Sequence, residues 1–159
     1  MDLDLAEVIG PTTPVVENQN GGRQSHLPVR LDVIPRALAA MMRQEYGGHT
    51  ETRRAIREIC ESLETHDARR IEAVLYGMLL DLGRSNAAMG VMVLGRVLWG
   101  GEQKYGQGNH MKIPFSEHLH HALVHLVSHE AGDRSEGESG HLAHATCRVA
   151  LALECLLQH

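Results

Sequence analysis

The chain has few aromatic residues: one tryptophan, three tyrosines and one phenylalanine among 159 residues. Proteins that bind single-stranded nucleic acid stack the bases on aromatic rings, and so few rings argue against such a platform. The formal net charge is −5 and the isoelectric point is near 6.2, so the chain also lacks the excess of basic residues by which a general nucleic-acid binder holds phosphates. We therefore expect no stable binding to nucleic acid.

Cysteines and long apolar segments are scarce as well. The three cysteines, Cys60, Cys147 and Cys155, show no Cys-x-x-Cys spacing, which indicates reduced thiols and not a disulfide framework. The first seven residues include three acidic residues and no basic one, whereas a secretory signal begins with basic residues. The longest apolar run, residues 87–95, is too short to cross a bilayer. These absences predict a cytoplasmic protein without membrane contact.

Residues 1–29 differ in composition from the rest of the chain. They hold three of the five prolines and a cluster of asparagine, glutamine and glycine at residues 18–22. Neither the helical nor the strand period is visible there, so the sequence predicts an extended N-terminal arm. The remaining residues, 30–159, are enough for a single domain with its own core.

Apolar residues recur at helical spacing in six segments of this domain. Pro35 suits the first turn of a helix, where its missing N–H needs no partner, and Asp67 suits an N-cap. In the fourth segment, Val91, Met92 and Leu98 are expected to face inward. The predicted helices span approximately residues 35–46, 51–64, 68–82, 86–99, 116–131 and 139–157. Because no strand pattern is visible, the sequence predicts an all-α, compact bundle of about six helices.

The stretch from residue 100 to residue 145 concentrates polar chemistry, since it holds eight of the twelve histidines. In the helix expected over residues 116–131, leucines form a core stripe and three histidines follow its edge, while His120 points away. The last helix repeats this arrangement. The polar residues that flank the two stripes are His118, His125 and His129 on the first helix and His141, His144 and Arg148 on the second.

Two loops adjoin these helices. The first, residues 100–108, contains four glycines, which allow a backbone to approach a ligand closely. The second joins the last two helices and carries Asp133 and Glu136. Because neighbouring antiparallel helices bring their flanks together, we expect a polar site between the last two helices and the glycine-rich loop, with carboxylates placed to hold a cation.

Residues 101–109, Gly-Glu-Gln-Lys-Tyr-Gly-Gln-Gly-Asn, resemble the Gly-x-x-Lys-Tyr-Gly-x-x-Asn motif of the phage dATP/dGTP diphosphohydrolase family, which includes MazZ-type enzymes. Residues 30–35, Arg-Leu-Asp-Val-Ile-Pro, are similar to that family's Arg-x-Asp-Leu-Ile-Pro segment. Further matches follow in the family's order at residues 113–114, 122–125, 132–133, 136 and 141–143. The resemblance covers roughly half of the chain, from 30 to 38 and from 90 to 155.

The resemblance implies hydrolysis of a purine deoxynucleoside triphosphate to the monophosphate and pyrophosphate, in phage nucleotide-pool remodelling within the host cytoplasm. A triphosphate and an acidic protein need a divalent cation between them, and the implied cofactor is Mg²⁺ or Mn²⁺. Related all-α pyrophosphatases assemble as oligomers, so a homo-oligomer is expected, formed through an apolar face between residues 50 and 98.

The resemblance also implies roles for individual residues. His125 would orient or deprotonate the attacking water, and Lys104 would offset phosphate charge. The implied catalytic residues are His125, Lys104 and Glu136; the implied substrate contacts are Lys104, Tyr105, Asn109, Arg148 and His141; and the implied metal ligands are Glu102, Asp133 and Glu136.

The chain departs from the family pattern at several positions. His110 stands where the family has tryptophan, Val124 replaces an arginine, and Cys147-Arg148 replaces a Trp-Asn pair. The loss of arginine at 124 removes one phosphate contact, and Arg148 could supply the charge instead. Two alternatives therefore stay open: a non-catalytic member that binds nucleotides or another protein, and a zinc-binding protein that uses His125, His129, His141 and His144.

A second acidic pattern lies outside this region. Glu58, Glu61 and Glu64 form Glu-x-x-Glu-x-x-Glu, and all-α nucleotide pyrophosphatases of the MazG type bind magnesium through such pairs. The three glutamates lie opposite the apolar stripe of their helix and alternate with arginines. This arrangement predicts a solvated, salt-bridged face.

Overall fold

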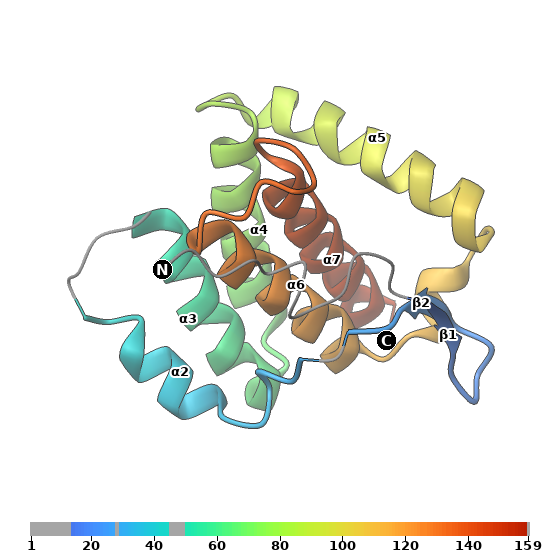
Figure 1. Ribbon diagram of the computed structural model, residues 1–159, viewed down its shortest axis with the longest axis horizontal. Coiled ribbons are helices and arrows are strands. Elements are labelled where there is room, and N and C mark those ends of the chain that lie inside the picture. Colours follow the sequence, from blue (N-terminus) through green and yellow to red (C-terminus); the bar gives the residue numbers. More distant parts are fainter. Residues whose placement is uncertain (1–13, 28, 45–49, 159) are drawn as a thin grey trace.

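The computed structural model describes residues 14–27, 29–44 and 50–158, and these residues are mostly helical (Figure 1). The described elements are β1 (Val15–Glu17), β2 (Arg23–Ser25), α2 (Pro35–Met41), α3 (Thr50–Thr65), α4 (Ala68–Leu82), α5 (Ala87–Tyr105), the 3₁₀-helix η1 (Asn109–Lys112), α6 (Phe115–Glu130) and α7 (Gly140–Leu157). The predicted bundle of about six helices is confirmed. None of the described helices combines the length and hydrophobicity that crossing a bilayer requires.

Several helix ends follow from local sequence. The Asp67 carboxylate accepts hydrogen bonds from the backbone N–H groups of Arg69 and Arg70 at 3.0 and 3.3 Å and so caps α4, as predicted. The Asn86 side chain caps α5 in the same way, accepting from Met89 N–H at 3.2 Å. Helix α2 starts at Pro35 but ends at Met41, earlier than the predicted end at residue 46, and residues 45–46 lie outside the described residues.

Helices α6 and α7 form the centre of the molecule, with α3 and α4 packed against them and α2 against α3 (Figure 1). Leu119, Leu123 and Leu126 on α6 are fully buried, and Val149 on α7 is also fully buried. This is the core stripe that helical spacing predicted. Burying such side chains stabilises a domain by about 1.5–3 kcal/mol each, so α6 and α7 are rigid supports for the polar residues that flank their stripes.

Helix α5 corrects two predictions. It does not end at the first pair of glycines but continues to Tyr105, so the expected loop begins only at Gly106. Of its 19 residues, only Gly90 and Leu94 are buried, and the three residues expected to face inward, Val91, Met92 and Leu98, are 51%, 61% and 38% exposed. The helix is apolar on most of its circumference, so its sequence period could not identify the inner face.

The short sheet is a further departure from the prediction, because no strand was expected. β1 and β2 pair antiparallel, with Val16 opposite Gln24. Three-residue strands are too short to show alternation. The connecting turn is held by the Asn18 side chain, which accepts hydrogen bonds from the N–H groups of Asn20 and Gly22, both at 2.9 Å, and donates to the Lys112 carbonyl at 2.8 Å. This hairpin is therefore fixed to η1.

Gly22 shows how closely the hairpin approaches the body of the protein. A Cβ atom at this position would lie 2.6 Å from the Lys112 carbonyl oxygen, a distance that van der Waals repulsion forbids.

The three glutamates of α3 form salt bridges, as predicted: Glu58 with Arg70 at 3.1 Å, Glu61 with Arg43 at 3.0 Å and Glu64 with Arg36 at 3.1 Å.

Candidate functional site

Helices α6 and α7 each present a polar row with the same spacing. His118, His121 and His125 on α6 lie at positions i, i+3 and i+7, which share one face of a helix. His141, His144 and Arg148 on α7 repeat this spacing. The rows meet at both ends: Nδ1 of His125 lies 2.9 Å from Nδ1 of His141, and Arg148 donates to Nδ1 of His118 at 3.2 Å and of His121 at 3.3 Å.

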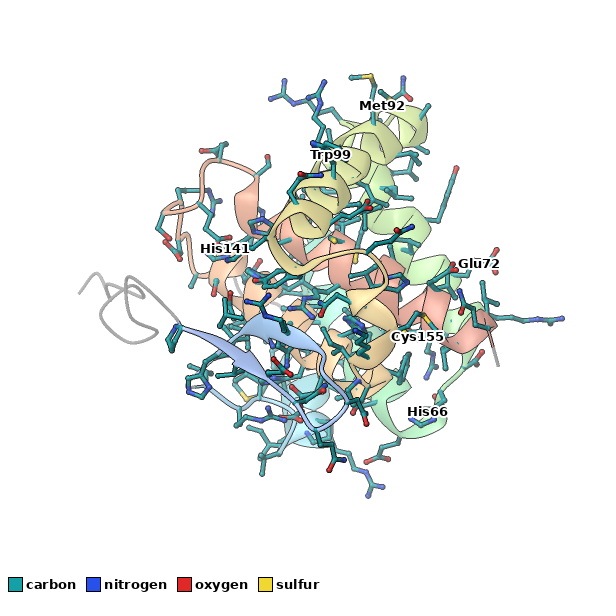
Figure 2. The ribbon with its side chains drawn as sticks, turned by 90° about the vertical axis from the view of Figure 1, so that its right-hand side faces the viewer. His66, Glu72, Met92, Trp99, His141 and Cys155 are labelled. Atoms are coloured by element: carbon teal, nitrogen blue, oxygen red, sulfur yellow. The ribbon has the colours of Figure 1, made fainter. Side chains whose placement is uncertain are left out.

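The loop between the two helices brings two carboxylates to the first of these ends. Oδ2 of Asp133 lies 2.6 Å from Nε2 of His141. Oε2 of Glu136 lies 2.8 Å from Nδ1 of His144 and 3.2 Å from Nδ1 of His141. Gly140 permits this approach, since a Cβ atom there would lie 2.7 Å from Cβ of Glu136. Figure 2 shows His141 beside this loop.

Three of these side chains form a candidate metal centre. Ligand atoms of His125, Glu136 and His141 all lie within 4.8 Å of one another. The ionised Asp133 carboxylate accepts a hydrogen bond from the Nε2–H group of His141, so Nδ1 of a singly protonated ring presents a lone pair to Glu136 and His125. A carboxylate that orients a histidine in this way is typical of metal sites. Two imidazoles and one carboxylate form a donor set that suits a divalent cation.

The surroundings keep these groups in the protonation states that a cation requires. Burial lowers the pKa of His125 to about 3, so its imidazole is neutral at pH 7. The hydrogen bond from His144 lowers the pKa of Glu136. Burial alone would raise the pKa of Asp133, but hydrogen bonds from Ser135 N–H and from His141 outweigh it and lower that pKa. Both carboxylates are therefore ionised at neutral pH.

The cluster opens into a cavity of about 770 Å³ between α5, the hairpin and the α6–α7 pair, a size typical of small-molecule sites. Four cationic side chains line it: Arg23, Arg96, Lys104 and Arg148. The Lys104 ammonium lies 5.1 Å from the centre of the Tyr105 ring. The cavity thus combines an acidic, histidine-rich end with walls that carry positive charge.

Most of the residues singled out from the sequence line this cavity: Lys104, Tyr105, Asn109, His125, Asp133, Glu136, His141 and Arg148. Glu102 does not. It lies on α5, which remains helical here, and it is exposed. The side-chain amide of Asn109 accepts from Arg23 N–H at 2.8 Å and donates to the Arg23 carbonyl at 2.9 Å, so it fixes the hairpin, and its predicted contact with substrate stays a prediction.

Two more histidines of α6, His118 and His121, line this cavity. The helical period in the sequence placed His118 beside the core stripe, whereas His121 was not singled out, although it lies four residues before His125 and so on the same face of α6. His118 and His121 are buried, and burial together with the Arg148 charge lowers their pKa values to about 4 and about 2. Arg23 and Ser25 line the cavity from the hairpin, and Gln24, between them in the sequence, contacts Arg148. No local pattern in the sequence pointed to these residues.

No curated protein and no solved structure matches the chain. The family model described as dATP/dGTP diphosphohydrolase, N-terminal, matches residues 79–159, slightly more than half of the chain. The matched segment contains α5, η1, α6 and α7, and with them both polar rows, the acidic loop and most of the cavity wall. The resemblance seen in the sequence is thereby confirmed, and the chain belongs to the dATP/dGTP diphosphohydrolase family.

Proposed function

We propose that this protein hydrolyses dATP or dGTP to the monophosphate and pyrophosphate with the help of a divalent cation, as an enzyme of phage nucleotide-pool remodelling. The observation that carries the proposal is the juxtaposition of the His125–Glu136–His141 cluster with the positively charged walls of one cavity. The family description, which names a diphosphohydrolase of these two nucleotides, supports it.

The charges of the cavity suit a triphosphate. Arg148 lies seven residues beyond His141 on α7, which corresponds to roughly 10 Å along a helix. A triphosphate whose α-phosphate lies at the His125–Glu136–His141 cluster can therefore extend through the cavity toward Arg148. Lys104 and Arg148 would offset the charge of the phosphates that do not contact the cation.

His125, Glu136 and His141 would hold the cation, with Asp133 orienting His141. A bound divalent cation neutralises phosphate oxygens and activates water for attack on phosphorus. Because transition-metal ions take imidazole more readily than Mg²⁺, which prefers oxygen ligands and retains its waters, this donor set favours Mn²⁺ of the two ions expected from the sequence. The exposed position of Glu102 gives no support to its predicted role as a ligand.

Hydrolysis requires a water oxygen to bond to the α-phosphorus while the bond from that phosphorus to the bridging oxygen breaks, so that pyrophosphate leaves. The chain's residues would place the α-phosphorus at the cluster by holding the other phosphates. The neutral, partly buried His125 can hold the cation through Nδ1 or accept a hydrogen bond there. If Nδ1 is a ligand of the cation, it is not free to take a proton from the water. Its predicted action on the attacking water stays a prediction.

A homo-oligomer is part of this proposal. The outer face of α5 exposes Val91, Met92 and Trp99, with exposed fractions of 51%, 61% and 63%, and Figure 2 shows Met92 directed away from the bundle. Contiguous exposed apolar side chains of this size are typical of interaction sites. We propose that α5 of one copy covers α5 of another.

One observation favours a second candidate function. A site of two histidines and one glutamate also suits zinc, so a zinc-binding protein without turnover is the alternative. Of the four imidazoles that the sequence suggested for zinc, two, His125 and His141, belong to the group of converging ligand atoms in the described part of the chain.

The test is to incubate the purified chain with each of the four deoxynucleoside triphosphates and either Mn²⁺ or Mg²⁺, and to separate the products by anion exchange. We expect dAMP or dGMP together with pyrophosphate, and a loss of at least about a hundredfold in turnover for Glu136→Gln. Glu138→Gln, in the same loop with its side chain 86% exposed, is the matched control. Absence of turnover with both ions, combined with one tightly bound zinc per chain, would support the alternative.

A further inference from the structure

The Arg148 guanidinium has an unusual set of partners, because all three of its described contacts are with neutral acceptors. It donates to Oε1 of Gln24 at 3.1 Å, to Nδ1 of His118 at 3.2 Å and to Nδ1 of His121 at 3.3 Å. Within the described ranges, no carboxylate forms a salt bridge with it. Burial lowers the pKa of Arg148, which reflects the cost of keeping this charge away from water.

The neutrality of the two histidines follows from their own contacts. Nε2 of His118 donates to the His110 carbonyl at 2.9 Å, so its Nδ1 is an acceptor for Arg148. His121 likewise turns Nδ1 toward Arg148, which leaves its proton on Nε2. A charged imidazole at either position would repel the guanidinium. Arg148, His118 and His121 together therefore carry only the single positive charge of Arg148.

Gln24 lies between this charge and the Glu117 carboxylate and contacts both. Its Oε1 accepts from Arg148, while its Nε2 donates to Oε2 of Glu117 at 3.3 Å. Glu117 in turn forms a salt bridge with Arg30 at 3.0 Å. The amide therefore cannot flip without placing a donor against the guanidinium and an acceptor against a carboxylate. A glutamate in place of Gln24 would reach the same atoms but would neutralise Arg148.

We infer that Gln24, on the N-terminal hairpin, is a positioning residue that keeps Arg148 oriented and uncompensated, so that the guanidinium serves as an anion subsite for the polyphosphate chain of the nucleotide. An unpaired cation that burial shields from water attracts an anion far more strongly than one already paired with a carboxylate. The inference rests on the proposed function for the identity of the ligand. It assigns a binding role to the hairpin, which lies outside the residues matched by the family model.

The experiment measures the affinity of inorganic triphosphate for the full chain in EDTA by isothermal titration calorimetry, so that neither the metal nor hydrolysis contributes. We expect Gln24→Glu to weaken binding by about tenfold or more. Gln19→Glu adds the same charge to the exposed turn of the same hairpin and should change the affinity less than twofold. Gln24→Met removes the hydrogen bonds without adding charge and should fall between the two.

A double-mutant cycle separates positioning from a general effect on the fold. In the Arg148→Met background, Gln24→Glu should have no further effect on triphosphate affinity, whereas a merely structural role for Gln24 would cause the same loss in both backgrounds. The inference is overturned if Gln24→Glu and Gln19→Glu behave alike, or if the wild-type chain does not bind triphosphate in EDTA. Turnover of dATP or dGTP with Mn²⁺, measured separately, tests the proposed function, so that either result can fail without the other.

Discussion

Nε2 of His141 lies 2.6 Å from Oδ2 of Asp133, and this hydrogen bond determines which nitrogen of His141 carries the proton and which one faces the candidate metal centre. With its proton on Nε2, the ring presents the lone pair of Nδ1 to Glu136 and His125. Asp133 thus acts on the cluster through His141. The acidic loop contributes one candidate ligand, Glu136, and one residue that orients a ligand.

Asp133→Asn should lower the affinity for Mn²⁺ by about 10–100-fold, the usual cost of losing a carboxylate that orients a ligating histidine. Turnover should fall with it. Calorimetric titration of the metal-free chain with Mn²⁺ measures the first effect, and Glu138→Gln serves again as the control from the same loop. Wild-type affinity in Asp133→Asn would show that the hydrogen bond to His141 does not organise the cluster.

The packing of α5 on α4 gives a prediction about stability. A Cβ atom on Gly90 would lie 2.1 Å from the Leu79 carbonyl oxygen, and a backbone atom cannot move aside as a flexible side chain can. Gly90→Ala should therefore reduce the free energy of unfolding by about 1–3 kcal/mol. Urea denaturation measures the change.

Gly95→Ala on the same helix is the matched control. Apart from its chain neighbours and the backbone of its own helical turns, no atom lies within 4 Å of the position of its Cβ, so alanine should stabilise the helix by about 0.5–1 kcal/mol through its higher helix propensity. Equal effects of the two substitutions would mean that α5 does not pack on α4 through Gly90.

The parts of the structure that the sequence predicted are those with strong local signals. Asp67 and Pro35 mark the starts of their helices by capping and by backbone geometry, and the leucines of α6 repeat with a clear period. The polar rows of α6 and α7 follow from the same period, so the meeting of His125 with His141 was within reach of the sequence. The placement of Asp133 beside these histidines required only a short loop between two antiparallel helices.

The parts that the sequence did not predict depend on contacts between distant segments. The apolar period of α5 does not define an inner face, and the hairpin is stabilised by Asn109 and Lys112, which lie more than 80 residues away. His120, expected to point away from the cluster, does so, but it is fully buried and lies 3.7 Å from Asp32.

The outer face of α5 predicts assembly in solution. Multi-angle light scattering at micromolar concentration should show a mass of at least two chains. Met92→Glu, at a side chain 61% exposed, should shift the mass toward the monomer because it would place an unpaired charge in an apolar interface. Val33→Glu changes an apolar residue that is 74% exposed before α2 and should leave the mass unchanged. A monomeric wild-type chain would contradict the assembly.

The buried histidines predict how stability depends on pH in the metal-free protein. The pKa of His118 falls from its ordinary value of 6.5 to about 4 in the folded state, chiefly through burial. Between these two pH values the unfolded chain binds a proton that the folded chain does not. The free energy of unfolding should therefore decrease as the pH is lowered from 6.5 to 4, by about 3 kcal/mol for this residue.

Urea denaturation at several pH values in EDTA measures this dependence, to which His121 and His125 contribute in the same direction because their pKa values are also lowered. His118→Gln retains groups that can bond to the His110 carbonyl and to Arg148 but cannot be protonated, so its stability should fall less steeply between pH 6.5 and pH 4. His26→Gln, at an exposed position after β2, should follow the wild-type curve. If His118→Gln follows it too, His118 does not remain neutral in the folded protein, and Arg148 does not have the neutral partner that the geometry assigns to it.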